Sequence, residues 1–400
     1  MPATLPEVLA ARQGGPAEGG ELYSGSMTGS PLAASLDRLL AGLPEPSRAL
    51  ALSRSPAGGL PEARELWRAR QRRAVPGEVA SSLPFAVSGL SHGLSLAADL
   101  FVRARTPVVV PQPFWGNYAQ AFGVRRGARM VPAPSFVEGR FDPESLGRAL
   151  AALPEGEPAL AILNFPSNPG GYSPSVEERE VLIGSLLAAA EERPLVVLCD
   201  DAYAGLVFEP EIPAGSLYWD LAGRHPNLTA VKIDGATKEF SFFGGRIGFL
   251  TFACEPGSPA AKALEARLAR WALSGVGPPS AASQAVLLEA LRSPGVEDRI
   301  AAIRGTLAGR YRALSGALAA ADPAVLTTFP FNSGCFALVE VPEGLGLSSD
   351  QVRRRLLAEE SVGLISIEPR SLRIAHCSVA AGDLPELVRR LERGIAGAAA

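Results

Sequence analysis

Short apolar runs alternate with amphipathic helical segments over the first two thirds of the chain. The runs are apolar at consecutive positions, which is typical of parallel strands covered by helices on both sides. Six runs are expected to form strands: Pro84–Val87, Pro107–Val110, Ala159–Asn164, Leu195–Cys199, Leu228–Ile233 and Ile247–Phe252. The segments expected to form helices include Leu60–Arg73, Leu94–Ala104 and Val176–Glu192. The pattern predicts an α/β fold with a mostly parallel sheet sandwiched by helices.

The pattern changes after Pro278 and Pro279. A long helical region, an alternating strand, a helix, a short strand and a terminal helix follow, which indicates a smaller α+β domain. These segments are Ser280–Ala321, Gly334–Val341, Ser348–Glu360, Leu372–Ala375 and Asp383–Ala396.

The N-terminal region is rich in Gly, Pro and Ser over residues 1–30, and we expect an extended arm followed by a short helix at Pro31–Leu43. We therefore expect three parts. Residues 1–47 form an arm and helix that belong to the small domain, residues 48–285 form the large domain, and residues 286–400 form the small C-terminal domain.

Composition and charge exclude several classes of function. The chain has 400 residues, of which 47% are apolar, and a formal net charge of −3, so we expect a sizeable core and no basic surface for nucleic acid. No stretch reaches the roughly 20 apolar residues of a membrane-spanning helix, and residues 1–20 do not resemble a secretion signal. The scattered cysteines favour buried thiols in a reducing compartment over disulfides or metal ligands; they are Cys199, Cys254, Cys335 and Cys377. We expect a soluble cytoplasmic protein that binds no metal, membrane or nucleic acid.

Lys238 follows the apolar run Leu228–Ile233. Desolvating an ammonium is costly unless it is paired or neutralised, and the same burial lowers the pKa of a lysine. A neutral amine can then attack a carbonyl to form a Schiff base. Eight residues later, Arg246 stands next to glycines and offers a fixed cation suited to a phosphate. Pyridoxal phosphate is an aldehyde that carries a phosphate, so it fits both residues. A lysine and an arginine eight residues apart are, however, more often simply surface charges.

Ligands of α/β proteins bind at the carboxyl ends of the strands, so the residues after each apolar run are candidates. After the first run, the backbone amides of Ser91 and His92 open a helix and favour a phosphate, while the His92 side chain has no expected catalytic part. After the second, Trp115 can cover a flat ring or simply belong to the core. After the third, X-Pro steps aim the amide of Asn168, which can bind a phenolic oxygen or tie its own turn.

The fourth run ends in Asp200-Asp201-Ala202-Tyr203. A carboxylate at the end of a buried strand must be paired or hydrogen-bonded. A pyridinium nitrogen would pair it, and the electron-sink chemistry of pyridoxal phosphate needs that nitrogen protonated. Alternation does not decide which of Asp200 and Asp201 faces inward, and Tyr203 can reach the cofactor's hydroxyl. Near the C-terminus, Arg373 stands in an apolar run and requires a carboxylate from the protein or from a substrate.

Taken in order, these residues resemble the class I/II aminotransferases, which carry pyridoxal phosphate on fold type I. The resemblance covers roughly residues 85–380, and the segment PFWGNY at residues 113–118 is closest to the aspartate and aromatic aminotransferases. The series consists of Trp115, Asn168 in NFPSNPGG, Asp200 and Tyr203 in DDAY, Lys238 with Arg246, and Arg373 in LRIAHCS. Each motif is weak or moderate alone, but their order and spacing together are specific.

The resemblance implies a role for each residue. Lys238 would form the Schiff base and then move the proton between the substrate's Cα and the cofactor's C4′. Asp200, rather than Asp201, would pair with the pyridine nitrogen. The remaining roles would be ring-hydroxyl binding by Asn168 and Tyr203, ring stacking by Trp115, phosphate binding by Arg246 and the amides of Ser91 and His92, and binding of the substrate's α-carboxylate by Arg373.

The phosphate site departs from the family's usual pattern. The family commonly has a serine three residues before the lysine, where this chain has Gly235, and Thr237 is expected to compensate. A tyrosine that reaches the phosphate of the neighbouring subunit is expected about midway along residues 49–60. No tyrosine stands there, and Arg54 aligns best as a second phosphate cation.

Two further departures concern the substrate. The threonine usual after Asn-Pro is Gly170. In the branch specific for dicarboxylates, an arginine stands six residues before the Pro-Pro. That position is Ala272 here, with Arg270 two residues away, so a dicarboxylic side chain is not supported.

We therefore predict a pyridoxal-phosphate-dependent aminotransferase that moves an amino group between an L-amino acid and a 2-oxo acid and works as a homodimer. A lyase, decarboxylase or oxidase on the same fold is the alternative, because fold does not settle reaction. A DNA-binding regulator built on this fold would need a basic helix-turn-helix, which residues 1–50 lack. A nucleotide-binding dehydrogenase would need GxGxxG after an early strand, and the sequence has none there.

Overall fold

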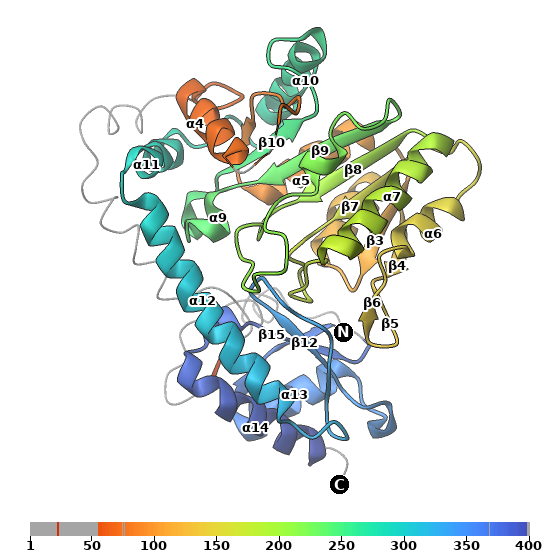
Figure 1. The fold of residues 1–400 in the computed structure, drawn as a ribbon, viewed down its shortest axis with the longest axis vertical. Helices are drawn as coiled ribbons and strands as arrows, with labels where there is room; N and C mark the ends of the chain where they lie inside the picture. The colour runs from red at the N-terminus through yellow and green to blue at the C-terminus, as the bar shows by residue number, and fades with distance from the viewer. Residues whose placement is uncertain (1–21, 24–54, 74, 76, 368, 398–400) are drawn as a thin grey trace. The chain divides into compact units, whose positions relative to one another are not determined.

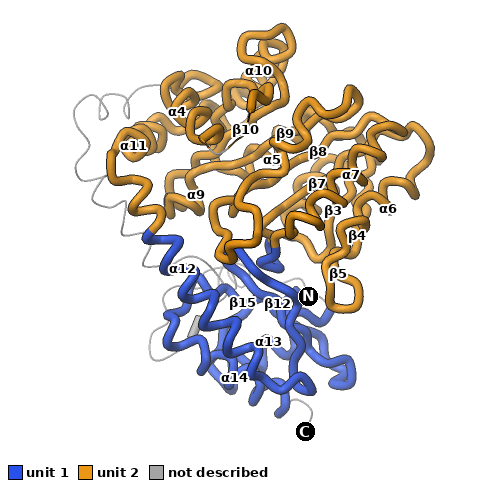
Figure 2. Tube along the Cα trace, viewed as in Figure 1, with its two compact units in different colours: residues 1–32, 168–172, 302–400 blue, residues 33–167, 173–301 orange. Residues whose placement is uncertain are grey.

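The computed structural model describes residues 22–23, 55–73, 75, 77–367 and 369–397. The chain divides into two compact units (Figure 2). Unit 1 consists of Met1–Leu32, Asn168–Tyr172 and Ala302–Ala400, and unit 2 consists of Ala33–Ser167 and Ser173–Ala301. Apart from Leu22–Tyr23, the predicted arm lies outside the described residues, as do the predicted helix Pro31–Leu43 and Arg54. The domain boundaries expected from the sequence stay a prediction.

A seven-stranded sheet forms the centre of unit 2, in the order β2-β10-β9-β8-β7-β3-β4 (Figure 1). Neighbours from β9 to β4 are parallel, and only β10 runs antiparallel to its neighbours β9 and β2. The strands are β2 (Phe85–Val87), β3 (Pro107–Gln112), β4 (Arg129–Pro134), β7 (Ala159–Leu163), β8 (Leu195–Asp200), β9 (Leu228–Asp234) and β10 (Gly248–Phe252). The predicted mostly parallel sheet is confirmed. The edge strand β4 was not predicted, because its sequence RMVPAP is half-exposed and carries two prolines.

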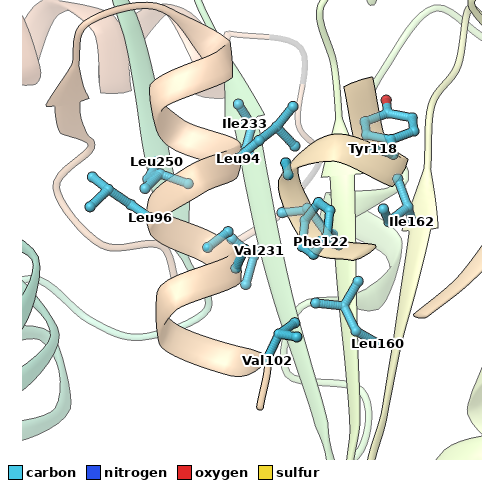
Figure 3. Packing of buried hydrophobic residues seen from close by; sticks show 14 of the residues in the cluster. Leu94, Leu96, Val102, Tyr118, Phe122, Leu160, Ile162, Val231, Ile233 and Leu250 are labelled. Carbon is cyan, nitrogen blue, oxygen red and sulfur yellow. The ribbon is translucent and has the colours of Figure 1, made fainter. Parts of the chain in front are cut away.

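Helices cover both faces of this sheet. One face packs on α5 (Leu90–Phe101), the π-helix η2 (Ala119–Val124) and α10 (Pro259–Gly275). Figure 3 shows Leu94 of α5 and Phe122 of η2 among Leu160, Ile162 and Val231 of the strands. The other face packs on α6 (Ser145–Ala151), α7 (Val176–Glu192) and α8 (Tyr218–Leu221). The sheet is therefore sandwiched by helices, as its doubly apolar strands predict.

A third group of helices packs around strands β2 and β10. Helix α4 (Pro61–Arg72) packs with α11 (Ala281–Arg292), and Trp67 of α4 stacks on Phe249 of β10 with ring centroids 4.8 Å apart. Between β9 and β10 the chain forms the short helix α9 (Ala236–Glu239) and the 3₁₀ turn η3 (Phe243–Gly245). These short elements carry the segment around Lys238.

Unit 1 is an α+β unit, as predicted. Its antiparallel sheet has the order β11-β12-β15-β14; the strands are β11 (Thr327–Thr328), β12 (Ala337–Glu340), β15 (Ser371–Ile374) and β14 (Ile365–Ile367). Separately, β1 (Leu22–Tyr23) pairs parallel with β13 (Val362–Gly363). The core of the unit joins this sheet to α13 (Ser349–Glu360), α14 (Leu384–Ala396) and the last turns of α12 (Val296–Ala319).

The helical region predicted over Ser280–Ala321 forms two helices. The region breaks into α11 and α12 at residues 293–295. Pro294 and Gly295 stand at the break. A proline interrupts a helix because it has no N–H to donate to the preceding turn and its ring clashes with that turn. Among the described helices none is both long enough and apolar enough to span a membrane.

Candidate active site

Asp200 is the last residue of β8 and is only 2% exposed. Its carboxylate accepts hydrogen bonds from the Tyr118 hydroxyl (2.6 Å) and from the backbone N–H of Ala202 (3.2 Å). Burial raises the pKa of Asp200 to about 6, although the hydrogen bond from Tyr118 acts in the opposite direction. No ion pair found within the described part of the chain includes Asp200. The fold therefore buries an acid whose described partners are a phenol and an amide, so a cationic ligand could still neutralise it.

Tyr118 is a site residue that the sequence reasoning did not identify. Its ring is buried in the core of unit 2 (Figure 3), and burial together with the nearby Asp200 raises its pKa well above the usual value. The phenol therefore stays protonated and can only donate to Asp200. The available signal was its position three residues after Trp115, but nothing in the sequence indicated that it would meet a residue 82 positions away.

Asp201 points to different partners from its neighbour. It forms a buried ion pair with Lys232 of β9, and the Lys232 ammonium lies 3.2 Å from the Asp234 carboxylate. Asp234 also accepts hydrogen bonds from Trp67 Nε1 (2.9 Å) and from the Gln71 side chain (2.9 and 3.0 Å). Asp201 is therefore neutralised by a resident lysine, whereas Asp200 has no described ion-pair partner.

Lys238 lies in α9, directly after β9, and is half-buried. Its amine lies 4.8 Å from the centroid of the Phe243 ring and 5.7 Å from that of Tyr203. The structure therefore brings Lys238 and Tyr203 together, as expected. Phe243 was not identified from the sequence, because a phenylalanine in a short turn carries no chemical signal of its own.

Arg246 lies against the beginning of α5. It has a left-handed backbone with φ of 47° and an exposed side chain. A Cβ on Gly89 would come 2.6 Å from Arg246 Nη2, so only a glycine lets the guanidinium approach this backbone. Ser91 and His92 stand in the first turn of the same helix. The arrangement joins a cation to the amide groups at a helix N-terminus, which suits a phosphate.

The His92 side chain has a structural contact. Its Nδ1 accepts a hydrogen bond from the backbone N–H of Ser88 at 3.2 Å, and burial lowers its pKa, with Arg125 adding to the effect. The expectation that the His92 side chain has no catalytic part stays a prediction.

Gly235 occupies the position at which the family that this sequence resembles commonly has a serine. A Cβ there would come 2.6 Å from the Ile247 carbonyl oxygen and 2.7 Å from Gly248 Cα, so backbone atoms of the neighbouring strand exclude any side chain. Two residues later, Thr237 is 7% exposed and its buried hydroxyl has no hydrogen-bond partner within the described structure. A buried hydroxyl without a partner is unusual and is available to a ligand.

Trp115 is half-buried and meets Tyr118 edge to face, with ring centroids 5.7 Å apart. Ala272 of α10 is buried in the core, and Arg270 of the same helix is exposed. In unit 2 the structure thus collects Asp200 with Tyr118 and Trp115, Lys238 with Tyr203, and Arg246 with the start of α5.

Unit 1 holds the other two predicted residues, Asn168 and Arg373. Arg373 Nη1 donates to Asn168 Oδ1 at 2.9 Å, and its guanidinium lies 4.3 Å from the centroid of the Phe336 ring. A Cβ on Gly171 would come 1.9 Å from the Phe336 carbonyl oxygen, so this glycine allows the Asn168 loop to pack on the strand segment. Asn168 therefore does more than tie its own turn, because it orients an arginine 205 positions away.

Comparison with known proteins gives a consistent result. Residues 57–391 match the model of a family described as aminotransferase class I and II. A 2-aminoadipate transaminase of Thermus thermophilus is 26% identical over 321 residues, which cover 78% of this chain and 74% of that protein. A tyrosine aminotransferase of Caenorhabditis elegans is 26% identical over 164 residues, and the match spans only 33% of its length.

Solved structures show the same fold. The α-aminoadipate aminotransferase LysN from Thermus thermophilus, crystallised with N-(5'-phosphopyridoxyl)-L-leucine, aligns with a TM-score of 0.76. The alignment covers 94% of this chain and 92% of that one at 23% sequence identity.

Proposed function

This chain belongs to the aminotransferase class I and II family, and on that premise we propose that it is a pyridoxal-phosphate-dependent aminotransferase. It moves an amino group between an L-amino acid and a 2-oxo acid. The observation that carries this proposal is Asp200, a buried carboxylate with no described ion-pair partner, on the strand next to the one that leads into Lys238. A protonated ring nitrogen is the cation that such a carboxylate would bind.

Three local features fit the cofactor. Asp200 offers the ring nitrogen a buried acceptor, which Tyr118 holds by a hydrogen bond. Arg246 lies against the backbone of Gly89, where the amides of Ser91 and His92 begin α5, and these groups suit the phosphate. The unpartnered hydroxyl of Thr237 supports its role as the donor that replaces the missing serine side chain.

The remaining residues have roles toward the ring and the substrate. Tyr203 and Asn168 bind the ring hydroxyl, and Trp115 stacks on the ring and contacts the substrate. Arg373 binds the substrate's α-carboxylate, and its contacts with Asn168 and Phe336 pre-orient the planar guanidinium for a bidentate pair. Asn168 thereby belongs to the substrate site as well.

Bound pyridoxal phosphate would supply the electron sink that makes the proton on the substrate's Cα acidic. Lys238 holds the cofactor through its amine and, once released, takes up that proton at Nζ. Its amine faces the rings of Phe243 and Tyr203. A homodimer and a cytoplasmic location belong to the same proposal, and light scattering after size exclusion tests the dimer.

Reductive trapping tests the cofactor assignment directly. The protein is loaded with pyridoxal phosphate, reduced with borohydride and digested, and the modified peptide is identified by mass spectrometry. The chain has only three lysines, Lys232, Lys238 and Lys262, so the outcome is unambiguous. We expect the label on Lys238. A label confined to the exposed Lys262, or no label, would contradict the proposal.

Absorbance during turnover tests the reaction. Amino acids are added singly to the loaded protein, followed by a 2-oxo acid. An aminotransferase loses its visible band with the amino acid and regains it with the oxo acid, without release of ammonia. Release of ammonia or carbon dioxide instead would favour the lyase, oxidase or decarboxylase alternative.

A further inference from the structure

Helix α4 holds the turn that carries Lys238 from both ends. Four residues before the lysine, Asp234 accepts hydrogen bonds from Trp67 Nε1 and from the Gln71 side chain. Directly after the lysine, Glu239 accepts a hydrogen bond from Arg70 Nη2 at 2.6 Å. Residues from a single face of one helix therefore contact both flanks of the Lys238 turn.

Arg70 makes the contacts on the C-terminal flank. Its side chain is only 12% exposed, and its guanidinium lies 5.0 Å from the centroid of the Phe240 ring. The other branch of the guanidinium pairs with Glu297 in the first turn of α12. One planar group thus joins the Lys238 turn to two helices, and this geometry is specific to arginine.

Glu239 in turn contacts the loop after β8. A Cβ on Gly205 would come 2.9 Å from Glu239 Oε1, so the carboxylate packs against this glycine, two residues after Tyr203. Glu239 therefore lies between Arg70 on one side and the Tyr203 loop on the other. Tyr203 is one of the two rings that Lys238 faces.

The turn needs this external support, because α9 has only four residues. A helix of that length is unstable on its own, and its geometry depends on tertiary contacts. The Lys238 side chain can keep its direction between the rings of Phe243 and Tyr203 only if residues 234–240 stay fixed. The contacts from α4 supply that restraint at three positions: Asp234, Glu239 and Phe240.

We propose that Arg70 is a positioning residue for the reaction, which acts by holding Glu239 and Phe240 and thereby fixes the direction of the Lys238 amine. This inference rests on the proposed function and deepens it, since no motif of the sequence pointed to α4. Arg70 touches neither substrate nor cofactor in this proposal; it acts through Lys238 alone.

An ordinary surface ion pair would have little effect, and the chain offers one as a matched control. Arg73 stands one position beyond α4, is 58% exposed, and pairs with the same Glu297 but has no described contact with Glu239. Arg73→Met removes an equal charge from the same region. Arg70→Met removes the restraint on the Lys238 turn as well, and Arg70→Lys keeps the charge without the planar fork.

The first measurement uses no cofactor. The full-length protein is reductively methylated with formaldehyde over a range of pH, and the modification of Lys238 is followed by mass spectrometry with the exposed Lys262 as the internal reference. The charged and titratable side chains described in or next to the turn are Glu239, Asp234, Arg70 and Tyr203. Lys232, which pairs with Asp201 and Asp234, and Glu297, which pairs with Arg70, lie beyond them. Loss of the Arg70 cation leaves the carboxylate of Glu239, which follows Lys238 in the chain, without its described ion-pair partner, and an unpaired carboxylate close to a lysine favours the protonated form. We expect the pH midpoint for labelling of Lys238 to rise by about half a unit in Arg70→Met and to stay unchanged in Arg73→Met.

The second measurement uses the loaded enzyme. A misdirected amine lowers kcat while leaving ground-state binding, so Arg70→Met should lose about tenfold to a hundredfold in kcat with KM changed less than threefold. Arg70→Lys should restore the labelling midpoint but only part of kcat. Thermal unfolding is followed in parallel for every variant.

Two outcomes would overturn the inference: wild-type labelling and kcat in Arg70→Met, or losses of stability and activity that Arg73→Met reproduces. A wild-type protein that never takes up pyridoxal phosphate would overturn the proposed function instead. In that case the labelling experiment still decides whether Arg70 fixes the Lys238 amine.

Discussion

Two of the three lysines of this chain lie six residues apart, in the segment that runs from β9 into α9. Lys232 is buried between Asp201 and Asp234. Burial alone would lower its pKa, but the two carboxylates outweigh this effect and raise it above the usual value. Lys238 instead faces the rings of Phe243 and Tyr203. The same residue type therefore forms a buried ion pair at one position and lies against aromatic rings at the other.

The two neighbouring aspartates repeat this contrast. Asp201 is neutralised by Lys232, whereas Asp200 is held by a phenol and an amide. Burial of a charged group does not by itself identify a reactive residue, because a buried ion pair satisfies both charges inside the protein. The partner identifies it: a charge that the fold leaves without an opposite charge is the one that a ligand can neutralise.

Removing Lys238 should have the largest effect on activity. Lys238→Ala is expected to lower turnover by at least about a thousandfold, because a positioned acid–base group alone is worth about 10²–10⁴-fold. The unfolding temperature should change little, since the side chain is only half-buried. Steady-state turnover and thermal unfolding check both parts. Substantial turnover in this variant would remove Lys238 from the mechanism.

Removing Lys232 should affect stability instead. Lys232→Met leaves two buried carboxylates without their ammonium, and we expect a loss of about 3–5 kcal/mol in the free energy of unfolding. Denaturant unfolding measures it, with the exposed Lys262→Met as the control. Adding Asp201→Asn to Lys232→Met should recover part of the loss. A stable Lys232→Met protein without activity would reverse our interpretation of this lysine.

The contribution of Asp200 to the free energy of unfolding depends on pH. Its pKa in the folded protein is about 6, above its value in an unfolded chain, so between pH 4 and pH 6 the folded state binds a proton that the unfolded state does not. Its contribution is therefore greatest at acid pH and is lost as the pH rises through 6, by about 3 kcal/mol in total. An asparagine at this position does not titrate, so its contribution to stability does not change with pH.

The test compares denaturant unfolding of wild-type and Asp200→Asn protein without cofactor. From pH 4 to pH 7 the variant should gain stability relative to wild type. Taking the difference between the two proteins cancels the other carboxylates. A difference that does not change with pH would mean that Asp200 titrates at an ordinary value.

Tyr118 should have a smaller effect on the same acid. Its hydrogen bond lowers the pKa of Asp200, so Tyr118→Phe should raise the acid limb of the kcat/KM profile by about one pH unit. Tyr218→Phe is the matched control, because Tyr218 is equally buried and its hydroxyl has no hydrogen-bond partner among the described residues. Equal shifts in both variants would deny Tyr118 a specific role.

The smallest effect should come from Thr237. Thr237→Val keeps the shape but removes a hydroxyl that makes no described hydrogen bond, so the fold should be unaffected. The affinity for pyridoxal phosphate should fall about tenfold, whereas the affinity for pyridoxal, which lacks the phosphate, should not change. Absorbance titration measures both. Equal losses for the two ligands would place the hydroxyl away from the phosphate.

Six of the seven strands in the central sheet of unit 2 could be predicted because each is apolar at consecutive positions, and their ends then indicated Asp200 and Lys238; the half-exposed edge strand β4 could not. The ion cluster around Lys232 could not, because that lysine lies inside an apolar run. Its partners are Asp201, directly after β8, and Asp234 of β9, which Trp67 of α4 contacts in turn. The Tyr118 contact was missed for the same reason, since it spans 82 positions. The helical region Ser280–Ala321 could be predicted from its pattern, but the division into α11 and α12 at Pro294 was not specified.

Gly235 also limits how this protein can evolve. A serine there would have to displace the carbonyl of Ile247 and Gly248 Cα, which are backbone atoms that side-chain rearrangement cannot move. The substitution would become tolerable only after the β9–β10 connection had changed, so the order of mutations matters at this position. Selection for tighter or weaker cofactor binding would therefore act first on Thr237 and the surroundings of Arg246, and lineages that share this glycine should diverge there.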